Sequence, residues 1–162
     1  MSRARAMRIA TAGAGFAVVA TLMLGGCTVE TTGLVGITRG DDGQIEALIA
    51  MCDGHVDSVI VYGGAGSNEK TLGTWDLAEP VTDSATLALP GLEAVLKDRV
   101  EYASYAGSAD NSSSARGPDF TKADIDSLPS TAVLVPDYTT EELSTEVLTR
   151  EGWQASVDAF CG

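Results

Sequence analysis

Alternating apolar and polar residues along most of the chain predict a series of short β-strands. Period-two alternation bounded by Gly, Asp and Asn is typical of strands that place one face on a core. The segment 44–52 fits a helix by spacing alone, but the Asp-Gly turns on both sides of it favour a strand. The predicted strands are residues 34–38, 44–52, 56–62, 71–77, 84–89, 100–106, 112–120 and 131–135.

Two segments near the end of the chain follow a helical pattern instead. Thr121 is a predicted N-cap for a short helix over 122–127, with Asp124 placed to complete a capping box. In 151–161, Trp153, Val157 and Phe160 recur at helical spacing and form an amphipathic stripe. Such a helix would cover a sheet with its apolar side.

Many short strands with turn residues between them are typical of a β-sandwich. We therefore predict an all-β fold of the Ig-like or fibronectin III-like class, with a short helix and a C-terminal helical segment. The apolar residues, 44% of a 162-residue chain, are enough for one core and exclude a wholly disordered protein. The predicted domain covers residues 33–162.

Residues 1–26 have the pattern of an export signal. Three Arg and no acid precede an apolar stretch over 9–24, which is shorter than the roughly 20 residues of a membrane-spanning helix. The exit, Leu24-Gly25-Gly26-Cys27, resembles the bacterial lipobox. This resemblance implies cleavage before Cys27 and a diacylglycerol thioether on its sulfur. The alternative is ordinary signal cleavage that leaves Cys27 as an incidental thiol.

A lipid on Cys27 predicts a protein anchored at the extracytoplasmic face of the cell membrane. Residues 27–32 would be the lipidated tether, and 28–32 reach at most roughly 17 Å. Cleavage removes three basic residues and no acid, which changes the formal charge from −13 to −16. Because an anionic leaflet repels acidic residues, we expect the least acidic face of the domain to lie toward the membrane.

The remaining two cysteines are consistent with this predicted location outside the cytoplasm. If Cys27 is acylated, Cys52 and Cys161 form an even pair in an oxidising compartment, and we predict a disulfide between them. That bridge would span 109 residues and contribute roughly 4–5 kcal/mol in the chain-entropy model. The alternatives are two free thiols or a Cys52 that helps to bind a metal.

Candidate reactive groups are few. Cys52, Asp53, His55 and Asp57 gather four possible metal ligands, but Asp-Gly is ordinary turn chemistry, so we predict a hairpin turn and no metal site. The Gly-rich segment 63–71 lacks the spacing of a phosphate-binding loop. We predict no catalytic residue, no cofactor and no enzymatic activity. The acidic charge argues against a nucleic-acid partner, and loose calcium binding stays open.

The segment 96–120 resembles the last hairpin of fibronectin type III domains. Leu96 lies six residues before Tyr102, as in the tyrosine corner of that family. The resemblance implies that the two side chains pack together and that the phenol bonds back to the chain. The stretches 105–114 and 119–128 are also similar to small secreted lipoproteins of actinobacteria, a likeness that implies no particular activity.

These observations predict an envelope lipoprotein with a non-enzymatic interaction or structural role. The loops 53–56, 63–70 and 107–117 are expected at one end of the sandwich, where they would contact an unknown envelope protein or ligand. One alternative is a small-ligand or metal-binding lipoprotein, and another is a minor envelope hydrolase.

Overall fold

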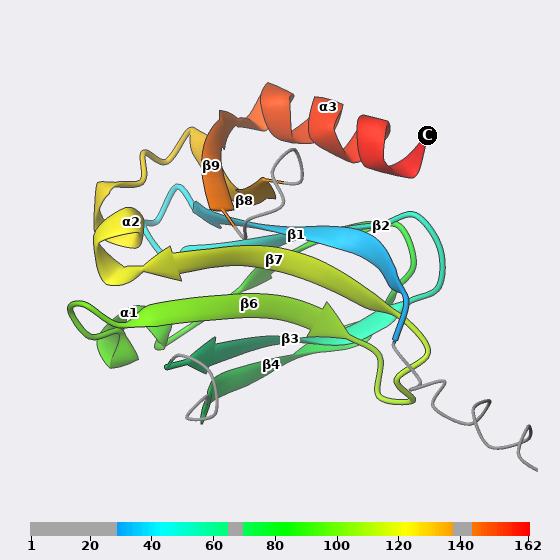
Figure 1. Ribbon diagram of the computed structural model, residues 1–162, viewed down its shortest axis with the longest axis horizontal. Coiled ribbons are helices and arrows are strands. Elements are labelled where there is room, and N and C mark those ends of the chain that lie inside the picture. The colour runs from blue at the N-terminus through cyan, green and yellow to red at the C-terminus, as the bar shows by residue number, and fades with distance from the viewer. Residues whose placement is uncertain (1–28, 65–69, 138–143) are drawn as a thin grey trace, which may run out of the picture.

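The computed structural model describes residues 29–64, 70–137 and 144–162, and strands make up most of them (Figure 1). The strands are β1 (Thr31–Arg39), β2 (Ile45–Met51), β3 (Val56–Gly63), β4 (Lys70–Val81), β5 (Ser84–Ala88), β6 (Glu101–Gly107), β7 (Ser114–Thr121), β8 (Ala132–Asp137) and β9 (Ser144–Thr149). The helices are α1 (Leu92–Val95), α2 (Lys122–Ser127) and α3 (Arg150–Cys161). The predicted predominance of β-structure is confirmed.

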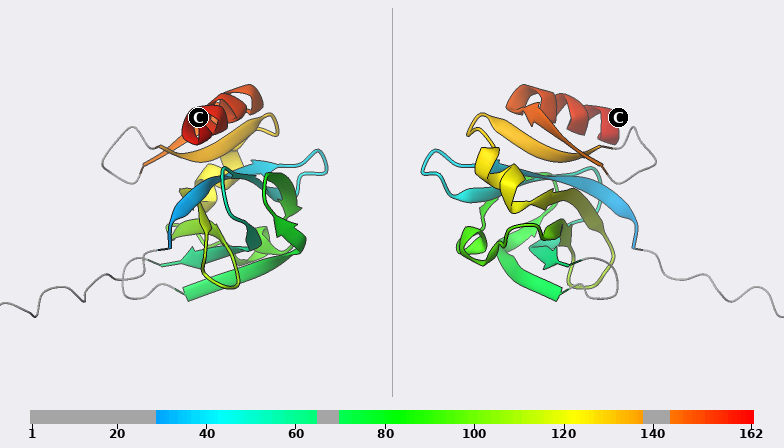
Figure 2. Two further views of the ribbon diagram at one scale, coloured as in Figure 1. Left: turned by 90° about the vertical axis from the view of Figure 1, so that its right-hand side faces the viewer. Right: turned by 60° about the vertical axis from the view of Figure 1, so that its left-hand side comes forward.

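The strands form one curled sheet in the order β4-β3-β6-β7-β1-β2-β5, with β8 beside β1 and β9 beside β8. β1 pairs with three other strands of the sheet. It is antiparallel to β2 along most of its length, parallel to β7 through its first half, and antiparallel to β8 through Ile37 and Thr38. Figure 2 shows that the sheet curls almost into a barrel, with α3 outside it against β8 and β9.

Each predicted strand overlaps an observed one, and the predicted hairpin over 100–120 is the antiparallel pair β6–β7. The helix over 122–127 has the predicted capping box, with Thr121 and Asp124 bonded reciprocally. Two elements were missed. α1 has only four residues, which is too short for a periodic signal, and β9 pairs with only one strand of the described sheet, β8.

The main core fills the inside of the curled sheet. From β2, the side chains of Ile45, Ala47, Ile49 and Met51 all face it, as their alternation predicts. The buried members of this main core are Val35, Ile37, Ile45, Ala47, Ile49, Met51, Val56, Val59, Val61, Leu89, Leu92, Leu96, Tyr102, Ala106, Ala115, Phe120, Ile125, Leu128, Ala132 and Leu134. Buried residues from six strands and two helices therefore share one interior.

A second, smaller apolar cluster lies on the outer face of β1 and β2. It consists of Leu34, Leu48, Ala50, Val133, Val135 and Trp153. Leu148 of β9 and Val157 of α3 pack against it while half-buried. This outer cluster explains why β2 lacks a polar face: β8 and α3 cover the side that would otherwise meet water.

Tyr102 forms the interaction that the resemblance of 96–102 to a tyrosine corner implies. Its ring is 2% exposed, and its hydroxyl accepts a hydrogen bond of 2.7 Å from the backbone N–H of Lys97. The ring centroid lies 5.7 Å from that of Phe120, and Leu96 is buried in the same core. The corner therefore closes the connection between α1 and β6 with both packing and a hydrogen bond.

The fold begins earlier than the predicted boundary at residue 33. Thr31 and Thr32, assigned to the tether, belong to β1. The carbonyl of Glu30 accepts a bond of 3.1 Å from Ser114 N–H, and the carbonyl of Thr32 accepts one of 2.8 Å from Cys52 N–H. Strand pairing thus holds residues that the sequence presents only as a polar run. The predicted signal peptide and Cys27 lie outside the described residues.

Candidate functional site

The chain enters the fold at the same end of the sheet where the disulfide lies. We call this region the disulfide end, and it consists of the segments 29–32, 52–57, 81–84, 107–114 and 158–162. Backbone bonds connect the segments: Met51 N–H donates to Asp83, and Ser114 N–H donates to Glu30. The disulfide end lies to the right in Figure 1, where the described part of β1 begins.

The predicted disulfide between Cys52 and Cys161 is confirmed, with the two Cα atoms 5.1 Å apart. It joins the residue after β2 to the last residue of α3, and both cysteines are exposed. Because a metal ligand must be a thiolate, the bonded sulfur of Cys52 is excluded from the metal constellation considered above. The bridge instead fixes the C-terminal end of α3 beside the β2–β3 turn.

The other groups of that constellation have protein partners. His55 Nε2 lies 3.7 Å from Asp57 Oδ2, and that oxygen accepts a bond of 2.7 Å from Ala109 N–H. Ser113 Oγ accepts from His55 N–H at 3.0 Å and donates to the His55 carbonyl. Within the described residues, no group of three His, Cys, Asp or Glu side chains is placed to hold a metal ion. These bonds instead connect the β2–β3 turn to the β6–β7 loop.

The β6–β7 loop is organised around two short polar side chains. Ser108 Oγ accepts bonds from the N–H groups of Ser112 and Ser113, at 2.9 and 3.1 Å. Asp110 accepts from Ser112 N–H at 3.0 Å, and hydrogen bonds from Ser112 lower the pKa of the Asp110 carboxyl to about 2. Asn111 adopts φ +56°, a left-handed conformation that Asn tolerates. The loop is thus ordered by its own hydrogen bonds.

The disulfide end is acidic. Its segments contain six Asp and Glu residues, one His and no Lys or Arg: Glu30, Asp53, Asp57, Asp83, Asp110 and Asp158 are the acids. The expectation that the least acidic face lies toward a membrane stays a prediction, and the described chain enters the fold at this acidic end. The signs of the charges could be read from the sequence, but strand pairing decided that these separate segments meet.

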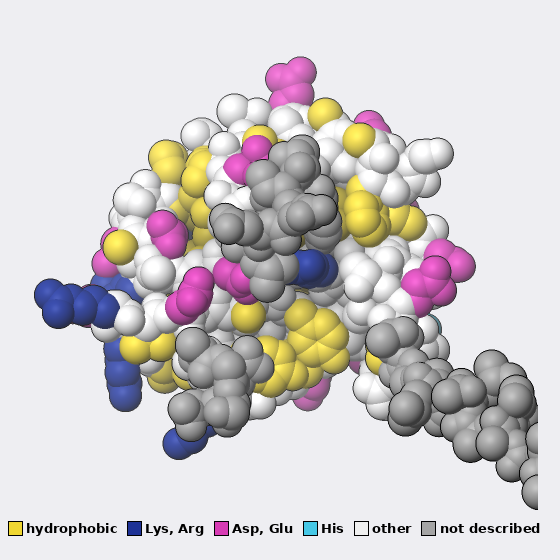
Figure 3. Space-filling view, viewed as in Figure 1, with side chains coloured by type: hydrophobic (Ala, Val, Ile, Leu, Met, Phe, Trp, Pro, Cys, Tyr) yellow, Lys and Arg dark blue, Asp and Glu magenta, His cyan; other side chains and the backbone are white. Residues whose placement is uncertain are grey.

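The opposite end of the sheet holds most of the cations. We call it the far end, and it carries six of the seven Lys and Arg that follow residue 27: Arg39, Lys70, Lys97, Arg99, Lys122 and Arg150. In Figure 3 most dark blue side chains on the visible face lie at the left, the side on which Figure 1 places α1. Asp and Glu are also present there, so the far end has mixed charge.

The three loops proposed as one contact region do not lie together. The turn at 53–56 and the loop at 107–113 meet at the disulfide end through Ser113 and His55. Gly63 and Lys70, which flank the third loop, pair with each other at the far end, where Gly63 also pairs with Tyr102. Residues 65–69 lie outside the described residues. The prediction of one shared end is wrong because β3 runs the length of the sheet between its two loops.

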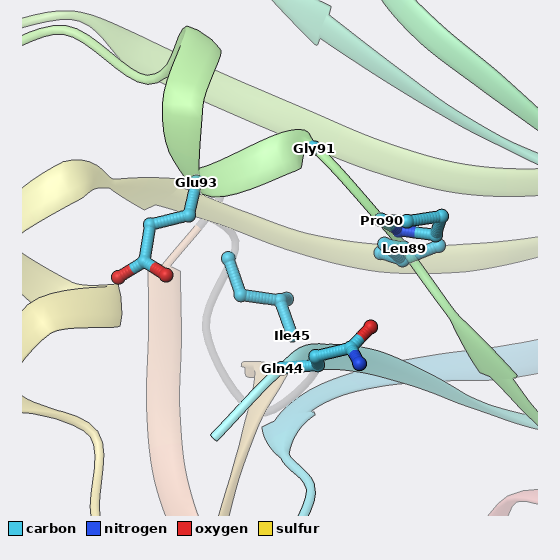
Figure 4. A pocket seen from close by; sticks show the side chains of 6 residues that line it. All are labelled: Gln44, Ile45, Leu89, Pro90, Gly91 and Glu93. Carbon is cyan, nitrogen blue, oxygen red and sulfur yellow. The ribbon is translucent and has the colours of Figure 1, made fainter. Parts of the chain in front are cut away.

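A shallow pocket lies at the far end between the β1–β2 turn and α1 (Figure 4). In Figure 4, Ile45 lies between Glu93 on one side and Pro90 on the other. Gly91 gives the backbone a φ of +80° at this point, and Gln44 and Leu89 complete the lining. The cavity volume of about 190 Å³ is below the range of about 300–1,000 Å³ that is usual for small-molecule sites.

The charged groups beside this pocket bond to each other. Arg39 Nη2 donates to Glu93 Oε1 at 3.0 Å, and other nitrogens of Arg39 donate to the carbonyls of Ile125 and Gly43. The guanidinium therefore connects β1, α1 and α2 and rigidifies the pocket wall. No sequence motif marked this pocket, because its lining comes from two turns brought together only by the fold.

Comparison with family models, with curated proteins and with solved structures found no match for this chain. No helix among the described residues is long and apolar enough to span a membrane. Within the described ranges, the two ends of the sheet differ in charge. The described chain enters the fold at the acidic end.

Proposed function

We propose that this protein is a lipid-anchored envelope protein of a bacterium. The leader over 1–26 directs export, and Cys27 carries a diacylglycerol thioether that holds the domain at the extracytoplasmic face of the cell membrane. The role of the domain is non-enzymatic, namely interaction or structure. The likeness to secreted actinobacterial lipoproteins supports this proposal.

The observation that carries the proposal is the position of Cys27 between leader and fold. Leu24-Gly25-Gly26-Cys27 ends the leader, and the fold starts almost at once, since the Glu30 carbonyl already bonds to β7. A lipobox-like sequence before a folded domain is consistent with a lipid anchor on Cys27. The Cys52–Cys161 disulfide supports export, because such bridges persist in oxidising compartments.

The body of the protein belongs, in this proposal, to the fibronectin III-like sandwiches. The order β4-β3-β6-β7 and the order β1-β2-β5 match the two sheets of Ig-like topology, and β7 beside β1 makes them continuous. The hydrogen bond between Tyr102 and Lys97 supports the same assignment. β8, β9 and α3 are additions that cover the outer face of β1 and β2.

Membrane fractionation tests the anchor. The full chain is expressed in a bacterium that processes lipoproteins, beside the matched variant Cys27→Ser, which keeps the leader and the disulfide but lacks the acceptor sulfur. The parent protein should sediment with membranes and enter the detergent phase, whereas Cys27→Ser should not enter that phase. Equal partition of the two proteins into the aqueous phase would refute the proposal.

A further inference from the structure

We propose that the disulfide end is the membrane-facing surface of the anchored domain, and that an anionic phospholipid surface repels it to the full length of its tether. This inference rests on the proposed function, because it assumes a lipid on Cys27. Beyond the anchor itself, the inference specifies which surface faces the bilayer and which end faces outward. It also specifies what sets the distance between the domain and the membrane.

The length of chain before the fold fixes the orientation. Glu30 is bonded to β7, so only three residue steps separate Cys27 from a fixed point of the fold. Three extended steps reach about 10 Å. β1 alone, with nine residues, is about 30 Å long and leads away from this point to the far end. The disulfide end is therefore held near the headgroups, and the far end cannot replace it there.

The charges at this end set the gap. The disulfide end carries six carboxyl groups and no Lys or Arg. The surface potential of an anionic leaflet decays over a Debye length of about 8 Å at physiological salt, which is close to the reach of the tether. Repulsion therefore acts across the whole tether and extends it.

Two exposed apolar side chains at the same end act in the opposite direction. Val29 is 39% exposed and Phe160 is 38% exposed, and they are two of the four large apolar residues of the described chain that have this exposure. Once salt screens the carboxylates, contact of these side chains with the interface is favoured. The gap between domain and bilayer is thus a balance that ionic strength shifts.

Orientation also decides which surface a partner meets. The far end, with the pocket between the β1–β2 turn and α1, points away from the bilayer. Its mixed charge contrasts with the disulfide end, which has six acids and no Lys or Arg. An envelope partner would thus approach the far end, and the loops at the disulfide end would lie in the gap.

Neutron reflectometry measures the gap directly. The chain from Cys27 onward, with its disulfide intact, is coupled through the Cys27 thiol to a maleimide lipid in a supported bilayer. Phosphatidylcholine bilayers with and without phosphatidylglycerol are compared at 20 mM and 500 mM NaCl. We expect a gap of about 10 Å on the anionic bilayer at low salt, as the tether allows, and a clearly narrower gap at high salt or on the neutral bilayer.

Two charge variants separate the local effect from the overall charge. Glu30→Gln, Asp53→Asn and Asp83→Asn together neutralise three exposed acids of the disulfide end, and should narrow the gap on the anionic bilayer at low salt. The matched control neutralises three exposed acids of the far end: Asp41→Asn, Asp98→Asn and Glu101→Gln. The control changes net charge equally and should leave the gap unchanged.

The inference would be overturned if the far end or a side of the sheet lay against the headgroups. It would also be overturned if the gap between domain and bilayer were equal on both bilayers, or if both triple variants narrowed that gap equally. The coupling chemistry makes this test independent of natural acylation. Failure of the proposed function would appear instead as aqueous partition of the expressed full-length protein.

Discussion

The two apolar clusters of this protein are held in different ways. The main core contains twenty buried residues contributed by strands and helices from the whole domain, whereas the outer cluster contains six. In the outer cluster α3 contributes one buried side chain, Trp153, and its last turn is exposed. The disulfide attaches that last turn to the β2–β3 turn. We infer that the main core keeps its structure without the disulfide, while α3 depends on that covalent bond.

Removal of the disulfide should have the largest effect and should separate the two regions. Replacement of both cysteines, Cys52→Ser with Cys161→Ser, removes a crosslink across 109 residues and should lower the free energy of unfolding by about 4–5 kcal/mol. Urea denaturation measures this loss. Hydrogen exchange should show α3 amides losing all protection, whereas amides of β3 and β6 lose only what the fall in global stability removes and stay protected. Unchanged protection of α3 would contradict the comparison.

A cavity in the main core should weaken the whole domain. Phe120 is 2% exposed and contacts Tyr102, so Phe120→Ala should cost about 4 kcal/mol. Protection in β3, β6 and β7 should fall together. The matched control is Val147→Ala on β9, whose side chain is 58% exposed and whose loss should cost less than about 0.5 kcal/mol. Equal losses from the two variants would show that the burial pattern is wrong.

The tyrosine corner offers a finer test of the main core. Tyr102→Phe keeps the ring but leaves the N–H of Lys97 without its acceptor, and should cost about 1–2 kcal/mol. Thermal unfolding followed by circular dichroism measures the shift. A variant as stable as the parent protein would show that this hydrogen bond contributes nothing.

α2 follows β7 and precedes β8 in the chain, and β8 contributes buried side chains to both clusters. Thr121→Ala removes the hydroxyl that accepts from Asp124 N–H, and should cost about 1 kcal/mol. Thr121→Ser, which keeps a capping hydroxyl, should recover most of that loss. The two variants should differ in urea midpoint, and coincident midpoints would argue against the capping box.

The smallest expected effect is a pH dependence in the β6–β7 loop. Because hydrogen bonds lower the folded-state pKa of Asp110 to about 2 from 3.8, its contribution to stability is present above pH 3.8 and is lost as pH falls toward 2. Asp110→Asn should flatten the dependence of unfolding midpoint on pH in that window. Ser112→Ala, which removes the side-chain donor, should flatten it in part. A slope identical in all three proteins would contradict this assignment.

Local patterns in the sequence were sufficient to predict most of the strands and helices that form the main core. The alternation in β2, the capping box at Thr121 and the spacing of Leu96 from Tyr102 each depend on residues close together in the chain. The disulfide could be predicted because the assignment of Cys27 to a predicted lipid anchor leaves one pair among the three cysteines. Such features need no knowledge of which strands become neighbours.

The missed features depend on pairing between distant segments. Trp153 covers Leu48 and Ala50 because β8 pairs with β1 and brings α3 to that face. No local sequence pattern indicates this pairing. The acidic disulfide end and the pocket beside Glu93 arise in the same way, from turns brought together by strand order. Register between distant strands is set by tertiary packing, so single segments carry little information about it.

The central claim is that a lipid on Cys27 anchors this domain, and intact mass spectrometry of protein purified from membranes tests it most directly. The account predicts a chain that begins at Cys27 and whose mass is increased by a diacylglyceryl group. A chain with the leader still attached, or one whose Cys27 sulfur is an unmodified thiol, would contradict the claim.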